Sequence, residues 1–265
     1  MEENKSSWLV PFAIIICLLL IGGAVYYKDL RVEDDTDKTD SIPTEISQIL
    51  KVDTGAKLET FRPVDSTDHL RGRVTAPIKL VVYTDLECPA CKYFHQQLQA
   101  VEREYVDTGK VAIILRNFPL DVLHTKSRNE ALAAECVNEL GGNDKFWQFI
   151  DKIFEITPSN DGLDPAKLNE TASTLGIEVK GFEACMTSKK YAENIEKSVQ
   201  EAVTLGAQGT PFFIITIDDQ IIPIFGGLPA ETLGLAFDLL LNPKTETTID
   251  ATNNTATGTE TVVEE

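Results

Sequence analysis

The sequence is short of positive charge. Its 265 residues include 24 lysines and arginines against 42 aspartates and glutamates, which gives a formal net charge of −18 at pH 7. Nucleic-acid binding depends on clustered Lys and Arg that release counterions from phosphates, so this balance argues against a nucleic-acid partner. It argues equally against acidic substrates and anionic membrane surfaces. The excess of acidic residues predicts a well-solvated surface with acidic tails.

Cysteine and histidine are also scarce, at five and three residues. Only Cys88 and Cys91 lie close together, in the motif DLECPAC (85–91), while Cys136 and Cys185 stand alone. A zinc site needs further ligands, and the histidines form no ligand-spaced set with these cysteines, so no metal site and no cofactor are predicted. A purely structural disulfide between cysteines this close in the sequence would reduce the entropy of the unfolded chain very little. The surroundings of the pair therefore favour redox chemistry.

Long apolar runs are limited to one segment, residues 8–27 (WLVPFAIIICLLLIGGAVYY), which contains no charge. At helical rise its length matches the hydrocarbon core of a bilayer, so it is predicted to be a retained membrane anchor. A cleaved signal peptide is the alternative, although no clear cleavage site follows the run. Lys and Arg flank both sides and do not determine the topology.

The rest of the chain divides by composition. Residues 1–7 form a short tail, and residues 28–54 form a polar, acidic linker without periodicity. Residues 243–265 are acidic and rich in threonine, and are predicted to be disordered. The folded body is expected between residues 55 and 242.

The body begins with a β-α-β pattern. Residues 78–84 form an apolar, β-rich run with too little alternation for an exposed strand, which indicates a buried one. Apolar residues then recur at helical spacing from residue 94 to residue 105, Gly109 ends this helix, and residues 111–118 form a second strand. Such a unit favours parallel pairing of its strands.

Helical patterns follow over residues 124–206, which are interpreted as an inserted helical domain. Ser127 and Glu130 have the spacing of a capping box at the start of its first helix. The aromatic-rich helix at residues 146–154 is expected to pack in the core, with a partner-binding groove as the alternative. A hairpin of strands 212–217 and 221–225 and a helix at 229–241 complete the order β-α-β, helical insertion, β-β-α.

The CPAC motif lies where the first strand meets the helix. Pro89 fits the first helical position, which makes Cys88 the predicted N-cap. Unpaired backbone N–H groups and the helix dipole then favour the thiolate, so Cys88 is the candidate nucleophile and Cys91, one turn further on, the resolving thiol. Asp85 and Glu87 lie close enough to oppose this effect, but by less than the helix terminus contributes.

Several landmarks together resemble the DsbA-type thioredoxin-like oxidoreductases. They are DLECPAC, FPL with the downstream His124, FW at 146–147 and GAQGTPFF at 206–213, and the resemblance covers about residues 63–241. It implies an α/β thioredoxin fold with a helical insertion. It also implies that Pro211 is cis and faces the cysteine pair, and that the backbone of Thr210 pairs with an extended substrate. An ordinary trans proline is the alternative.

The sequence departs from this family at two positions. Val82 replaces the buried acid that often assists proton transfer to the second cysteine, so water or another group must handle that proton. Ala90 replaces the histidine of the strongest oxidants, so the pKa of Cys88 is expected to lie between that of a free thiol and theirs. His95 is expected at the surface, with a proton shuttle as the alternative, and His124 has no assigned role.

Some relatives of this type also carry a structural disulfide in the helical insertion. The resemblance therefore implies a Cys136–Cys185 bridge, with two buried free thiols as the alternative. Such a bridge would indicate an oxidising compartment.

The function implied is that of a membrane-tethered thiol-disulfide oxidoreductase. Its catalytic domain is expected outside the cytoplasm, at the cell surface or in a periplasm-like space, donating disulfides to reduced exported polypeptides. A quinone-linked membrane protein of DsbB or vitamin-K-epoxide-reductase type is the expected re-oxidase. The alternatives are a reductase or isomerase of the same fold, and a redox-inactive binding or chaperone module.

Overall fold

The computed structural model describes residues 58–242. The predicted tail, anchor, linker and C-terminal segment (1–7, 8–27, 28–54 and 243–265) lie outside the described residues. Within residues 58–242 no helix is both long enough and apolar enough to cross a membrane. The described residues all belong to one compact unit.

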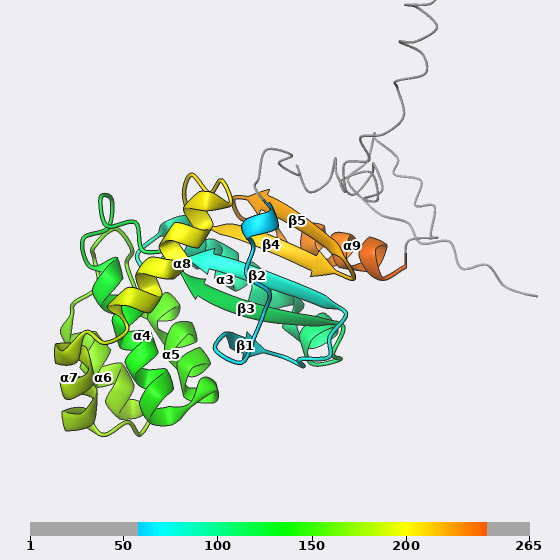
Figure 1. Cartoon of the computed structure of the whole chain (residues 1–265). Coiled ribbons are helices and arrows are strands. Elements are labelled where there is room, and N and C mark those ends of the chain that lie inside the picture. The colour runs from blue at the N-terminus through cyan, green and yellow to red at the C-terminus, as the bar shows by residue number, and fades with distance from the viewer. Residues whose placement is uncertain (1–57, 243–265) are drawn as a thin grey trace, which may run out of the picture. The chain divides into compact units, whose positions relative to one another are not determined.

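A five-stranded mixed sheet lies at the centre of the described part (Figure 1). Its strands run in the order β1-β3-β2-β4-β5, and β2 pairs parallel with β3 while the other neighbours are antiparallel. The strands are β1 (His69–Arg71), β2 (Ile78–Thr84), β3 (Val111–Asn117), β4 (Phe212–Ile217) and β5 (Gln220–Phe225). The short edge strand β1 was not predicted. The predicted β-α-β unit and hairpin are confirmed.

Strand β2 is buried on both faces, which explains its continuous apolar sequence. Leu80 and Val82 belong to one hydrophobic cluster, and Val81 and Tyr83 belong to the other. The crossover to β3 consists of helix α3 (Pro89–Val101) and a π-helical turn (Glu102–Val106). Helix α9 (Ala230–Leu241) contacts α3. The CPAC motif thus lies at the start of a helix that packs against α9.

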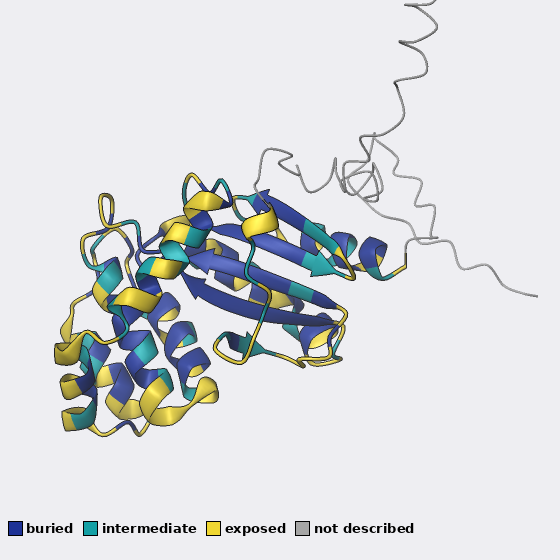
Figure 2. Cartoon of the chain, viewed as in Figure 1, coloured by how far each residue is buried: buried dark blue, intermediate teal, exposed yellow. Residues whose placement is uncertain are grey.

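Five helices between β3 and β4 form the predicted insertion, at one end of the sheet (Figure 1). They are α4 (Ser127–Gly141), α5 (Asn143–Ile156), α6 (Ala166–Thr174), α7 (Val179–Ser188) and α8 (Ala192–Thr204). Their inner faces are buried and their outer faces exposed (Figure 2). The aromatic residues of α5 lie in the main cluster, so the prediction of core packing is confirmed.

The predicted capping box is wrong. Lys126 occupies the N-cap position of α4, and its side chain forms no capping hydrogen bond with the helix end. The Ser127 hydroxyl donates instead to the His124 carbonyl oxygen, 2.9 Å away. Glu130 is buried rather than folded back on the helix end. The capping pattern failed because Glu130 faces another carboxyl group, that of Glu87, which only the tertiary fold brings near.

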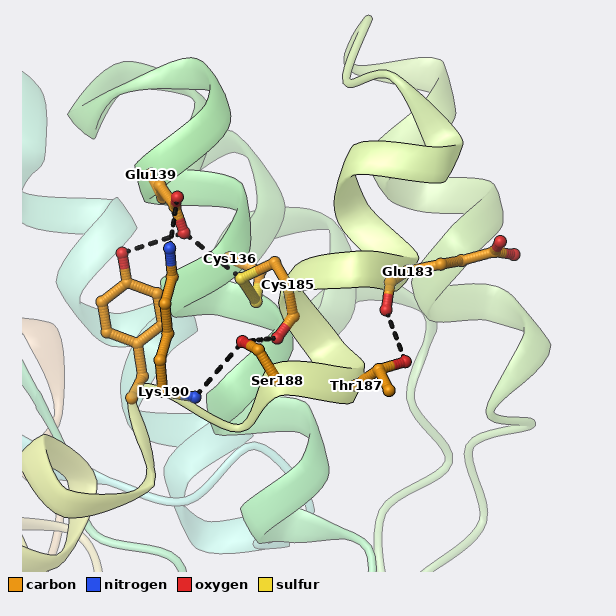
Figure 3. The surroundings of a disulfide bond; sticks show 8 residues. Cys136, Glu139, Glu183, Cys185, Thr187, Ser188 and Lys190 are labelled. Atoms are coloured by element: carbon orange, nitrogen blue, oxygen red, sulfur yellow. Dashed lines mark hydrogen bonds and ion pairs between the residues drawn. A yellow bond between two sulfur atoms is a disulfide. The ribbon is translucent and has the colours of Figure 1, made fainter.

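A disulfide joins Cys136 of α4 to Cys185 of α7 (Figure 3). The Ser188 hydroxyl donates to the Cys185 carbonyl oxygen within α7 at 2.7 Å, and Lys190, just after α7, ties the end of this helix to α4 through an ion pair with Glu139. The Tyr191 hydroxyl donates to the same Glu139 carboxylate at 3.1 Å. The bridge thus fastens two helices within the insertion.

Candidate active site

Cys88 is the N-cap residue of α3 and directly precedes Pro89 in the first turn. Its backbone is extended, with φ −81° and ψ 122°, because the chain leaves the buried strand β2 just before the helix begins. Both thiols of the motif are free and largely shielded from solvent, with exposures of 6% for Cys88 and 1% for Cys91. Cys88 is therefore the more accessible sulfur.

The loop before β4 lies against this sulfur. The Cys88 thiol donates to the backbone carbonyl oxygen of Thr210 at 3.5 Å, although the two residues are 122 positions apart. The Thr210–Pro211 peptide is cis. Beside the loop lies an open hollow of about 330 Å³, lined by Gln208, Gly209, Thr210, Pro211, Phe225 and Gly226. The structure thus brings the two predicted halves of the site together, with room for a partner next to them.

The surroundings of Cys88 favour its thiolate. Together they lower the pKa of Cys88 from 9.0 to about 6, and the hydrogen bond from Cys91 is the largest cause. Burial opposes this effect, while Thr210 and the backbone N–H groups of Cys91 and Ala90 add to it. Ala90 thus contributes through its backbone N–H at the helix terminus.

Cys91 has the opposite tendency. Burial raises the pKa of Cys91 well above that of an ordinary thiol, and the neighbouring Cys88 raises it further. At neutral pH the reduced pair therefore consists of a Cys88 thiolate and a Cys91 thiol. This division matches the predicted roles of nucleophile and resolving thiol.

Asp85 and His124 form a buried pair beside the motif. Asp85 Oδ2 lies 3.0 Å from His124 Nδ1 and accepts from the Leu120 N–H at 2.8 Å, and Oδ1 accepts from the Glu87 N–H at 2.8 Å. Burial alone would lower the pKa of His124, but Asp85 and then Cys88 raise it overall. The sequence left His124 without a role, whereas in the structure it pairs with Asp85 beside the cysteine motif.

Glu87 and Glu130 form a second buried pair. Glu87 Oε1 accepts from the Leu163 N–H at 3.3 Å, but neither carboxyl group has a partner for its Oε2 among the described residues. Burial and, after it, the Glu87 carboxyl raise the pKa of Glu130 to about 9. Glu130 is consequently protonated at neutral pH, so the pair carries at most one negative charge.

The position of His95 differs from the prediction. It was expected at the surface, but it is only 6% exposed, and its Nε2 lies 2.8 Å from Asp151 Oδ1. Its ring stacks on Phe154 with the ring centroids 4.7 Å apart. The helical pattern of α3 failed to predict this because the partner, Asp151, comes from α5 in the insertion.

Within residues 58–242, no group of three or more His, Cys, Asp or Glu residues is placed to hold a metal ion.

When the reduced protein is titrated and the ultraviolet absorbance of the thiolate is recorded, the Cys88 thiolate should form with a midpoint near pH 6. Because this pKa lies below that of an unfolded thiol, ionised Cys88 stabilises the reduced protein. The stabilisation is complete above about pH 8.5 and is lost as the pH falls through the folded pKa. Cys88→Ala is the control, since it should remove both the absorbance and this pH dependence. A midpoint above about pH 8 would contradict the interpretation.

Comparisons with known proteins agree on the fold. The family model described as Thioredoxin matches residues 65–223. The probable disulfide bond formation protein D of Bacillus anthracis is 31% identical over 216 residues, which cover 80% of this chain and 88% of that protein. The crystal structure of alpha-DsbA1 from Wolbachia pipientis aligns with a TM-score of 0.60 at 25% identity, over 69% of this chain and 94% of that one.

Some similar proteins are much longer. The Na(+)/H(+) antiporter NhaA 3 of Salinispora tropica is 33% identical over 159 residues, which cover 60% of this chain but 23% of the antiporter. The chain thus spans about a quarter of the length of the antiporters that it matches. The match concerns a segment of these proteins and not their whole length.

Proposed function

The chain belongs to the thioredoxin family, among its DsbA-like thiol-disulfide oxidoreductases, and we propose that it donates a Cys88–Cys91 disulfide to reduced polypeptides outside the cytoplasm. The observation that carries this proposal is the position of the Cys88 sulfur. It lies at the N-terminus of α3, against the carbonyl oxygen of Thr210, with its pKa lowered to about 6.

The reaction proceeds by two thiol-disulfide exchanges. A substrate thiolate attacks Cys88 Sγ, the Cys88–Cys91 bond breaks, and Cys91 leaves with the electron pair. A second substrate thiolate then attacks the substrate sulfur of the mixed disulfide and displaces Cys88 as a thiolate. Two electrons thereby pass from the substrate to the protein, and the substrate gains a disulfide.

The low pKa of Cys88 supports donation rather than reduction. A thiolate that is stable in the dithiol form lowers the free energy of the reduced protein, which makes the disulfide form the stronger oxidant. A low-pKa thiol is also the better leaving group in the second exchange. A reductase or isomerase would gain less from this stabilisation.

Substrate binding is assigned to the hollow beside Thr210 and Pro211. An extended polypeptide there would pair through main-chain hydrogen bonds, which do not depend on its side chains. This mode of binding suits a protein that oxidises many different chains. Re-oxidation is assigned to a quinone-linked membrane protein of DsbB or vitamin-K-epoxide-reductase type, and the predicted anchor at residues 8–27 would hold both partners in one membrane.

Replacing Cys91 by serine tests the proposal. The variant keeps the nucleophile but loses the thiol that resolves mixed disulfides, so Cys91→Ser should accumulate covalent adducts with exported polypeptides, visible on non-reducing gels. The double variant Cys88→Ser, Cys91→Ser is the control and should trap none. A redox-inactive binding module predicts no adducts with either variant. Equilibration of the wild-type protein with glutathione then separates an oxidant from a reductase, because each tenfold change in the equilibrium constant shifts the potential by about 30 mV.

A further inference from the structure

A small cavity lies behind the active site, next to the sulfur that solvent does not reach. Its volume is about 10 Å³, which is close to the smallest space that holds one water molecule. Cys91 and His95 line it from α3, Thr84 from β2 and Trp147 from α5. Because Cys91 and His95 are four residues apart on one helix, their side chains share the face that borders this cavity.

The cavity has polar groups that suit a water molecule. The indole N–H of Trp147 is buried and has no hydrogen-bond partner among the described residues. The Thr84 side chain is within hydrogen-bonding reach of the Cys91 thiol. A buried water needs about two to four polar partners, and Trp147, Thr84, Cys91 and His95 are the residues with polar side-chain atoms among those that line the cavity.

Asp151 orients His95 and connects it to solvent. Burial raises the pKa of Asp151, but hydrogen bonds from His95 and Arg71 lower it overall, so the carboxylate is ionised. His95 Nε2 therefore donates to Asp151 Oδ1 at 2.8 Å, and Nδ1 is left to gain and lose a proton. The side chain of Asp151 is 34% exposed, so this pair extends from the cavity to the protein surface.

We propose that His95, oriented by Asp151, carries protons between solvent and Cys91 through a water molecule in this cavity. The proposal deepens the proposed function, on which it rests, because it assigns the proton transfer that each exchange at Cys91 requires. His95 is a positioning and relay residue and does not itself touch the substrate. His95 would take over the role of the buried acid that related proteins often carry at the position of Val82.

The proton balance is complete. When a substrate thiolate breaks the Cys88–Cys91 bond, Cys91 leaves as a thiolate and takes a proton from the cavity water. The water recovers a proton from Nδ1 of His95, while Nε2 takes one that enters from solvent through the Asp151 carboxyl group. During re-oxidation the proton leaves Cys91 by the same path before its sulfur attacks. No other oxidant, reductant or co-reactant is needed.

Charged groups face His95 from several elements. Cys91 faces it from its own helix, and Asp151 faces it from α5. Arg71 of β1 contacts the other oxygen of Asp151 at 2.7 Å and is itself paired with Glu102 of the π-helical turn. Lys152 and Glu155 of α5 line an open hollow together with His95. All of these groups stay in place when His95 alone is replaced.

The relay can be tested with His95→Gln and oxidised glutathione in stopped-flow experiments. Glutamine retains a hydrogen bond to Asp151 but cannot carry a proton. Cys88 first attacks glutathione, and Cys91 then resolves the mixed disulfide. We expect His95→Gln to slow only the second step, by about 10²-fold, the lower end of general acid–base catalysis. Gln99→Ala is the matched control: Gln99 also contacts Asp151, at 3.4 Å, but is exposed and outside the cavity, so both steps should keep their wild-type rates.

The pH profile distinguishes a relay from a structural role. In His95→Gln the rate of the second step should rise about tenfold per pH unit, because only spontaneously formed Cys91 thiolate reacts. In the wild-type protein the rate of the second step should stop rising as the pH increases. Equal rates and slopes in the two proteins would overturn the relay. If the variant fails to fold, the wild-type protein decides: a slower second step in D₂O, with an unchanged first step, supports the relay, and no isotope effect overturns it.

These outcomes are separate from the test of the proposed function. Glutathione reports on Cys91 whichever way electrons flow in the cell. Equal behaviour of His95→Gln and the wild-type protein would reject the relay alone, whereas failure of Cys91→Ser to trap polypeptides would reject disulfide donation.

Discussion

Cys88→Ser should leave the reduced protein almost inert towards a thiol-alkylating reagent at neutral pH, whereas Cys91→Ser should remain reactive. The remaining thiol of Cys88→Ser is Cys91, which is 1% exposed and has a pKa well above that of an ordinary thiol. A thiol with such a pKa is less than about 1% ionised at neutral pH, and only the thiolate reacts. We therefore expect the alkylation rates at the motif to differ by at least about 100-fold.

Peptide mapping by mass spectrometry gives these rates residue by residue, so that Cys17 in the predicted anchor does not contribute. The same reaction in denaturant is the control, because unfolding should make the two variants equally reactive. Similar rates in the folded variants would mean that Cys91 is as available as Cys88, and the assignment of nucleophile and resolving thiol would then be wrong.

Cys136→Ala, Cys185→Ala should lower the free energy of unfolding by about 4 kcal/mol. The bridge closes a loop of 49 residues, and the unfolded chain loses entropy in proportion to the logarithm of that length. Alanine suits both positions because the two side chains are buried and alanine introduces no polar group there. The loss should appear in urea unfolding followed by circular dichroism.

The comparison is best made in a Cys88→Ser, Cys91→Ser background, where only the bridge in the insertion responds to reductant. Reductant should bring the bridged protein to nearly the stability of the alanine variant and leave the alanine variant unchanged. A difference below about 1 kcal/mol would show that the bridge does not constrain the unfolded chain as this model requires.

The elements with a strong local pattern could be predicted from the sequence. Strands β2 and β3, the amphipathic helix α3, the hairpin of β4 and β5 and the helical insertion all have apolar runs or helical periodicities that can be recognised in their own residues. Strand β1 has only three residues, too few for any periodicity. The position of Cys88 as N-cap was also predictable, because Pro89 directly follows it.

The side chains around the cysteines could not be predicted in this way. Glu130 matched a capping box by its spacing, yet it faces Glu87 across the fold, 43 residues earlier in the chain. His95 matched an exposed position, yet it contacts Asp151 of α5. Each contact joins segments that are distant in sequence, and a buried polar residue can be recognised only once its partner is known.

The edges of the sheet have a further consequence for the proposed function. Among the described strands, β5 is one edge and carries Pro223, which has no N–H for a new neighbour, and β1 at the other edge has three residues. Exposed edges invite pairing with other chains and aggregation, and these two offer little to pair with. A client polypeptide would therefore dock beside the cysteines without extending the sheet, and could be released once it has been oxidised.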